Sequence, residues 1–240
     1  MFCFYRKLLY VCLILALVTP LKGQEIQTKK LILPAFLADA AVPTSYVLAN
    51  GARHLNLYAG TLGHPFLVSS TFSTGNHVII NGKKFDDITL NFDVHNMILI
   101  IQYDFDRLGK QRYIPPVNSV ESFSIDGRKF VRFSYAPDGD VKFYEEIYSG
   151  YYGIYNLYSK KYEVNRNNLQ QFEFSEVAKS TYVYYNNEFY RYRSNRGFVN
   201  SFPDEFQPEI KDYLRENKMN VRNISRTRMQ EILKYINALD

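Results

Sequence analysis

Asn81-Gly82-Lys83-Lys84-Phe85, followed by Ile88-Thr89-Leu90-Asn91-Phe92-Asp93-Val94, is the stretch of sequence that decides the fold. The Asn-Gly pair accepts the positive φ angles that a two-residue hairpin turn requires. After it, apolar residues alternate with polar residues, which is typical of a strand with one face on a core and one in water. The stretch therefore predicts an antiparallel hairpin.

The same turn chemistry recurs, and β-type patterns fill most of the chain between about residues 65 and 192. Asp126-Gly127 and, more weakly, Asn186-Asn187 predict two further hairpin turns. Further strands are expected at Met97–Ile101, around Val131, Phe133 and Tyr135, and at Phe143–Tyr148 and Tyr151–Tyr158, the last two flanking a tight turn at Ser149-Gly150. No helical pattern separates these strands, which favours an antiparallel meander, open or curled into a half-barrel or barrel.

The C-terminal part changes to a helical period. Phe206, Ile210, Tyr213 and Leu214 predict a first helix ending by Asn217. Met229, Ile232, Leu233 and Ile236 predict a second, with Ser225 and Thr227 as candidate caps. We therefore expect a mainly β fold with two short C-terminal helices. Its predicted divisions are a signal peptide (1–23), an irregular lead-in (24–60), an antiparallel β domain (61–200) and a helical segment packed on it (201–240).

The N-terminus has the layout of a secretory signal peptide. Arg6 and Lys7 precede the apolar run Leu8–Val18, and Pro20 and Gly23 follow it. The run is shorter than the roughly 20 apolar residues of a membrane-spanning helix. We expect cleavage after Gly23 and export to the periplasm, the outer-membrane surface or the exterior, with no transmembrane span after cleavage.

Cleavage would change the charge and the cysteine count of the working chain. The leader holds Cys3 and Cys12, the only cysteines, and three basic residues with no acid, so the formal net charge would fall from +5 to +2. A mature chain without cysteine excludes disulfides, thiolate metal sites and thiol nucleophiles. A nearly neutral exported chain also argues against nucleic acid as a partner.

Sequence motifs for chemistry are weak. The four histidines, His54, His64, His77 and His95, have no metal-ligand spacing, so neither a metal nor another cofactor is expected. The sequence has three carboxylate pairs: Asp86-Asp87, Asp104 with Asp106, and Glu145-Glu146. Adjacent residues on a strand point to opposite faces, so neighbouring acids cannot form a catalytic pair, and we interpret all of these acids as solvated charges. Phosphate-binding and nucleophile-elbow motifs are absent from the sequence. We predict no catalytic residues.

The most unusual segment is the hairpin around Asn186-Asn187, which is dense in tyrosine and arginine. Tyr190 and Tyr192 would share one face, and Arg191 and Arg193 the other. Together with Tyr184 they are candidates for binding a sugar ring or a protein partner. Cross-strand aromatic pairing that only stabilises the sheet is the alternative interpretation.

Four parts of the chain carry a resemblance to other proteins: the leader, the Asn81–Phe85 hairpin with Leu90–Val94, the segment Phe143–Gly150 and the ending from Phe202 to Leu239. In these parts the chain resembles a loose group of uncharacterised secreted proteins from Gram-negative Bacteroidota. The resemblance implies export, and it supplies no activity and no catalytic residues.

Three hypotheses for function follow. The preferred one is a non-enzymatic binding or interaction protein of the bacterial cell envelope, whose partner is an envelope protein, a glycan or an apolar ligand. A curled sheet with an apolar cavity would instead carry a lipid or another apolar molecule. Carboxylates from separate strands would make the protein a hydrolase.

Overall fold

A computed structural model describes residues 51–105, 109–133 and 140–239 of the chain. Contacts divide the chain into Met1–Val42 and Pro43–Asp240, and every described residue belongs to the second unit. The predicted leader, residues 24–50 of the lead-in, and Tyr135 lie outside the described residues.

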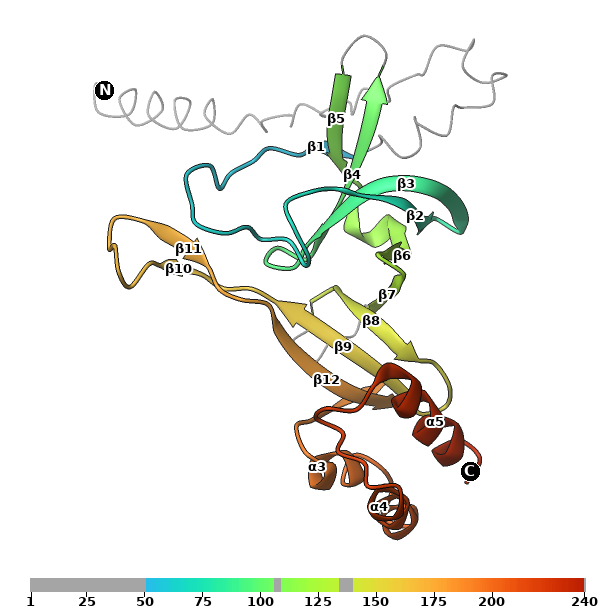
Figure 1. The fold of residues 1–240 in the computed structure, drawn as a ribbon. Helices are drawn as coiled ribbons and strands as arrows, with labels where there is room; N and C mark the ends of the chain where they lie inside the picture. Colours follow the sequence, from blue (N-terminus) through green and yellow to red (C-terminus); the bar gives the residue numbers. More distant parts are fainter. Residues whose placement is uncertain (1–50, 106–108, 134–139, 240) are drawn as a thin grey trace, which may run out of the picture. The chain divides into compact units, whose positions relative to one another are not determined.

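The described residues form one large antiparallel sheet, a small hairpin and three helices (Figure 1). The strands of the large sheet are β1 (Ala52–Arg53), β2 (Ser73–Ile80), β3 (Lys83–Asp93), β4 (Ile98–Phe105), β5 (Gly109–Ile114), β6 (Val120–Ile125), β7 (Arg128–Phe133), β8 (Lys142–Tyr148), β9 (Gly153–Ser159), β12 (Ala178–Tyr185) and β13 (Glu188–Tyr192). The small hairpin pairs β10 (Tyr162–Val164) with β11 (Phe172–Phe174). The helices are α3 (Asn195–Val199), α4 (Gln207–Glu216) and α5 (Arg226–Ile236), and a 3₁₀ turn covers Val117–Ser119.

The strand order confirms the predicted meander. It runs β1-β5-β4-β3-β2-β6-β7-β8-β9-β12-β13, so two runs of sequential hairpins are joined where β2 pairs with β6. Strands β1 and β13 are the two edges of this order, so the sheet is open and the barrel alternative is not realised.

All three predicted turn dipeptides close hairpins with left-handed backbones. Asn81 and Gly82 have φ of 49° and 75°, and Asp126 and Gly127 have 49° and 72°. Asn186 and Asn187 have 50° and 62°. Two consecutive positive φ angles match the twist of the flanking strands, which is why Asn, Asp and Gly occupy these positions.

The connection at Ser149-Gly150 is longer than predicted. Strand β8 ends at Tyr148 and β9 begins at Gly153, so Tyr151 and Tyr152 belong to the connection. Tyr152 is buried against the helices, and its backbone N–H donates to Asn237 Oδ1 at 2.9 Å. Tyr152 thus makes a contact with the helical segment, which the alternation of apolar and polar residues cannot distinguish from a strand position.

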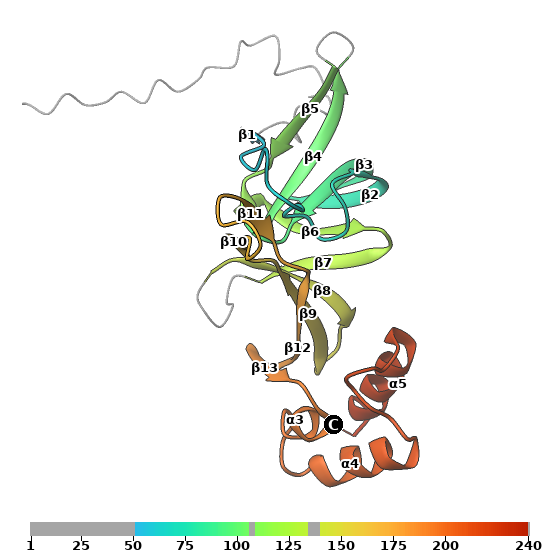
Figure 2. The same ribbon diagram turned by 60° about the vertical axis from the view of Figure 1, so that its left-hand side comes forward.

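Two hydrophobic clusters lie on the sheet. The first gathers residues of β2, β3, β4, β6, β7 and β8. At its centre are four phenylalanine rings, whose contacting pairs have centroids 5.1 to 5.9 Å apart: Phe92, Phe123, Phe130 and Phe143. The second joins Ile154 of β9 and Val183 of β12 to the three helices. The helices lie beside β9, β12 and β13 (Figure 2), so this end of the sheet has a helical layer on one face.

The two predicted helices are confirmed, with one correction to the caps. Helix α4 has Pro208 in its first turn and ends at Asn217. Helix α5 is capped by Ser225, whose Oγ accepts the backbone N–H of Arg228, and Thr227 lies inside the helix. The short helix α3, within the predicted β domain, was not expected, because five residues are too few for a helical period.

Candidate functional site

A hollow with a volume of about 610 Å³ lies against β8, β9, β12 and β13, mostly on the side of the sheet that carries the helices. Its floor includes Glu145 and Asn156, and residues 221–229 form its opposite wall. Besides Arg226, which pairs with Glu145, four basic residues line it: Lys179, Arg191, Arg193 and Arg222. We call this hollow, with Glu145, Asn156 and these four basic residues, the basic pocket.

Glu145 on the floor has both carboxylate oxygens occupied. Oε1 accepts from Arg128 Nε at 3.1 Å and from Arg226 Nη1 at 3.2 Å. Oε2 accepts from Asn156 Nδ2 at 3.0 Å and from the Tyr158 hydroxyl at 2.6 Å. The side chain is only 5% exposed, so these four donors replace water for the buried charge.

The same contacts set the protonation of Glu145. Burial raises its pKa, but hydrogen bonds from Asn156 and Tyr158 and the charge of Arg128 outweigh burial, so the pKa lies below its usual value. Burial and the bond to Glu145 raise the pKa of Tyr158. Glu145 therefore stays ionised and acts as an acceptor that ties Arg226 of α5 to the sheet.

The neighbouring Glu146 points to the other face. It pairs with Lys129 at 3.0 Å, whereas Glu145 faces the pocket. This agrees with the expectation that adjacent acids on a strand cannot form a catalytic pair. The prediction that Glu145 is a solvated charge is wrong, because its strand register places it opposite Asn156 and under α5.

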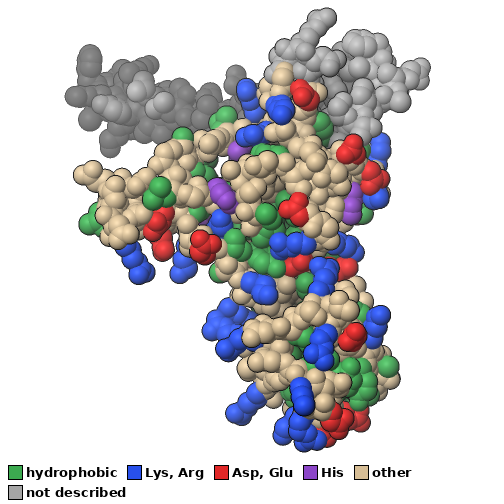
Figure 3. Space-filling model, in the orientation of Figure 1, with side chains coloured by type: hydrophobic (Ala, Val, Ile, Leu, Met, Phe, Trp, Pro, Cys, Tyr) green, Lys and Arg blue, Asp and Glu red, His purple; other side chains and the backbone are tan. Residues whose placement is uncertain are grey.

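The four basic side chains around the pocket have no carboxylate partner among the described residues. Arg191 donates through Nη2 to Ser180 Oγ at 2.7 Å. The Arg222 guanidinium donates to the carbonyl of Arg193, at 3.4 Å from Nε and from Nη2. All four are exposed, and Lys and Arg side chains are visible over this part of the surface (Figure 3). The pocket thus presents uncompensated positive charge.

Tyr192 adds a polar group that has no partner among the described residues. It lines the pocket and is 6% exposed, and its ring packs against Phe198 with centroids 5.0 Å apart. Its buried hydroxyl has no hydrogen-bond partner within the described ranges. Burial raises its pKa, so this hydroxyl stays protonated and able to donate.

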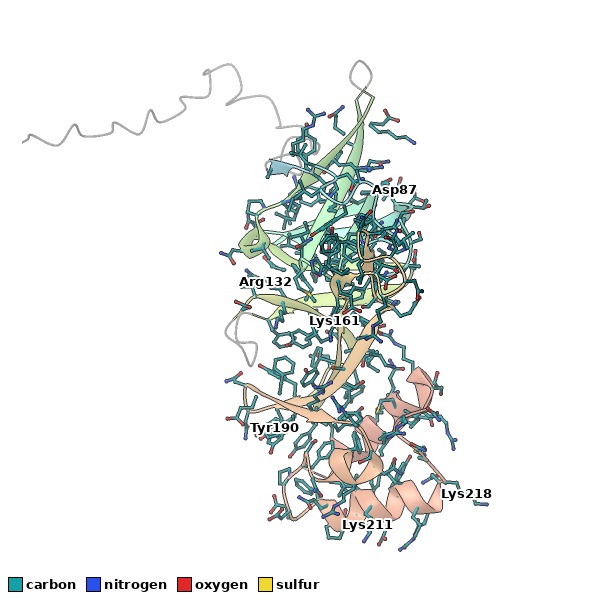
Figure 4. All side chains as sticks on the ribbon, turned by 90° about the vertical axis from the view of Figure 1, so that its left-hand side faces the viewer. Asp87, Arg132, Lys161, Tyr190, Lys211 and Lys218 are labelled. Atoms are coloured by element: carbon teal, nitrogen blue, oxygen red, sulfur yellow. The ribbon has the colours of Figure 1, made fainter. Side chains whose placement is uncertain are left out.

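The structure brings three of the five candidate binding residues together, Arg191, Tyr192 and Arg193. Tyr190 lies on β13 beside the helices (Figure 4), where its ring stacks on Tyr185 and its hydroxyl donates to Glu188 at 2.6 Å.

Tyr184 lies on the opposite face of the sheet. There it is one of an aromatic cluster with Phe133, Tyr155 and Phe189, and its hydroxyl donates to Asn187 at 3.1 Å. The tyrosines of the hairpin are thus divided between two faces. A binding role stays a prediction for all five candidates.

The other pocket residues come from elements far apart in the sequence. Asn156, Lys179, Arg222 and Arg226 carry no local motif. The pairing of β8, β9 and β12 places Asn156 and Lys179 near Glu145, and the packing of α5 and the connection before it adds Arg222 and Arg226. Among these four residues, only Arg222 and Arg226 had a sequence signal, because they belong to a cluster of basic residues near the second predicted helix.

The histidines and the other acids of the described residues are the kinds of group that metal binding and catalysis require. Among the described residues, no three His, Cys, Asp or Glu side chains are placed to hold a metal ion. Ser124 Oγ lies 2.9 Å from His77 Nδ1, but the same Oγ accepts the His77 backbone N–H, as in a cross-strand contact between β2 and β6. Asp87, labelled in Figure 4, is exposed on β3, as is Asp86.

The chain matches no family model, and no match was found among curated proteins or solved structures. The resemblance to secreted Bacteroidota proteins therefore stays a prediction. Within the part of the chain that the structure describes, no helix is both long and apolar enough to cross a membrane.

Proposed function

We propose that this chain is an exported, non-enzymatic binding protein of the bacterial cell envelope that holds an anionic group in the basic pocket. The observation that carries the proposal is the convergence of Lys179, Arg191, Arg193 and Arg222 on one hollow without a carboxylate partner in the described residues.

The floor of the pocket does not oppose an anion. Glu145 is the one acid among the lining residues, and Arg128 and Arg226 both pair with it. Arginine suits this role because its planar guanidinium binds carboxylate or phosphate through two parallel hydrogen bonds.

The other two hypotheses have less support. A lipid carrier needs a large apolar cavity, but the first hydrophobic cluster is filled by residues such as Phe123 and Phe130, both 0% exposed. A hydrolase needs a carboxylate free to accept or donate a proton, whereas both oxygens of Glu145 are bonded. Binding without chemistry is the function that the pocket supports best.

Export is the part of the proposal that rests on residues 1–23. We expect the protein recovered from cells to begin at Gln24, because the leader has the charged, apolar and small-residue regions of a cleaved signal. Intact-mass spectrometry of the protein from envelope and medium fractions would measure this. A mass that retains Met1 through Gly23 in every fraction would contradict export by cleavage.

Anion binding should depend on the arginines around the pocket. We expect the double variant Arg193→Glu/Arg222→Glu to bind tripolyphosphate and a glutamate oligomer at least about tenfold more weakly, since two attractive charges become repulsive. Isothermal titration at low salt would measure both affinities.

The matched control is Arg166→Glu, which reverses an exposed charge outside the pocket lining. It should bind like the wild type. The proposal fails if the wild type binds neither probe, or if the double variant binds both as tightly as the wild type does.

A further inference from the structure

Strand β12 has an unpaired edge beside the basic pocket. On one side, β9 pairs with β12 from Ala178 to Tyr184. On the other side, β13 pairs with it only from Thr181 to Tyr185. The backbone from Ala178 to Ser180 therefore has a neighbouring strand on one side only, and an edge of this kind can accept another strand.

The edge is open because the chain leaves the sheet after Tyr192. Ser194 caps helix α3 by accepting the backbone N–H of Gly197, so β13 cannot continue alongside Lys179 and Ser180. The helix start thus replaces the residues that would have covered this edge.

The basic pocket extends around this edge. Thr181 and Tyr192 are cross-strand partners, as are Tyr182 and Arg191, so Tyr192 and Arg191 point to opposite faces. The pocket is lined by Thr181 and Tyr192 from one face and by Ser180 and Arg191 from the other. A hollow that touches both faces of a sheet reaches around its edge.

We propose that the ligand of the basic pocket is an acidic peptide segment in extended conformation, which adds a strand to β12 at Ala178–Ser180. Its carboxylate side chains would lie among Arg191, Arg193 and Arg222. This inference rests on the proposed function, because it identifies the anionic group as part of a peptide. Backbone hydrogen bonds to β12 would supply the affinity, and the charged side chains would supply the specificity, as in other cases of strand addition.

Charge complementarity favours this occupant. Lysine at an edge strand disfavours the addition of neutral and basic strands, whereas acidic side chains of an added strand would meet Lys179 on one face of the sheet and Arg191 on the other. A compact anion would use the charges and leave the open backbone edge unused.

The test compares three labelled peptides by fluorescence anisotropy with the mature protein. The first alternates glutamate with valine, the second has the same sequence with N-methylated backbone amides, and the third has glutamine in place of glutamate. We expect the second and third to bind at least about tenfold more weakly than the first.

Two further measurements locate the bound peptide. Amide hydrogen exchange within Ala178–Ser180 should slow when the first peptide is bound. The double variant Arg193→Glu/Arg222→Glu should weaken binding of this peptide, whereas Arg166→Glu should not.

The outcomes separate this inference from the proposed function. If the N-methylated peptide binds as tightly as its parent, or if exchange at Ala178–Ser180 is unchanged, strand addition is wrong while anion binding stands. If tripolyphosphate binds and the glutamate peptide does not, the pocket takes compact anions and the peptide is wrong. If the glutamine peptide binds as tightly as the glutamate peptide, the acidic peptide is wrong while binding of tripolyphosphate still supports the proposed function. If neither tripolyphosphate nor the glutamate peptide binds, both proposals are overturned.

Discussion

Replacing Glu145 by alanine is expected to lower the free energy of unfolding by about 3 kcal/mol. Breaking a buried ion pair by removing one partner costs about 3 to 5 kcal/mol, because charges and donors are left without a partner. Here Arg128, Arg226 and the Tyr158 hydroxyl would all lose their acceptor. The arginine side chains are 28% and 41% exposed, so water would partly replace Glu145, which places the loss at the lower end of the range.

The neighbouring Glu146 supplies the control. Its ion pair with Lys129 involves a side chain that is 49% exposed, and such pairs contribute up to about 1 kcal/mol. Urea denaturation of Glu145→Ala and Glu146→Ala would measure the difference. Equal losses for the two variants would contradict a special role for the contacts of Glu145.

The pH dependence of stability tests the same contacts. The pKa of Glu145 is depressed in the folded chain from its ordinary value of 4.5, so its contribution is present above pH 4.5 and is lost as pH falls through the lower folded value. Glu145→Gln should therefore show a flatter decline in the free energy of unfolding below pH 4.5 than the wild type.

Local signals made part of the fold predictable. Asn81-Gly82, Asp126-Gly127 and Asn186-Asn187 determine their turns through their own backbone preferences, which no distant contact has to supply. The pairing of β2 with β6 was not predicted, because it joins strands that are not consecutive in the sequence. The strand prediction for Tyr151–Tyr158 includes Tyr152, because an aromatic residue in this pattern is typical of a strand. In the structure, the Tyr152 ring instead packs against the helices, a contact that only the folded chain reveals.

The candidate site was predictable to the extent that its residues are neighbours in sequence. Arg191, Tyr192 and Arg193 form an unusual run at the end of β13, and composition alone identifies them. Glu145 and Arg222 come from a strand and a helix connection far apart in the chain. Their meeting depends on strand register and on helix packing, and neither leaves a pattern within a short window.

The Leu233→Ala variant should lose about 3 to 5 kcal/mol of unfolding free energy. Leu233 is 0% exposed in α5 and belongs to the cluster that joins the helices to β9 and β12. Truncation there removes apolar burial and leaves a cavity, and the cost of such Leu→Ala changes is about 2.7 to 5 kcal/mol. Because α5 also carries Arg226 and Met229, this packing holds one wall of the basic pocket.

Leu169 provides the same substitution at a site that is 79% exposed, so Leu169→Ala should change stability by less than about 0.5 kcal/mol. Chemical denaturation followed by circular dichroism would measure both variants. A small loss for Leu233→Ala would mean that α5 contributes little to the stability of the domain, and the pocket wall would then lack the support inferred from its packing. A large loss accompanied by weaker tripolyphosphate binding, under conditions where the variant is still folded, would connect the helical layer to the binding site.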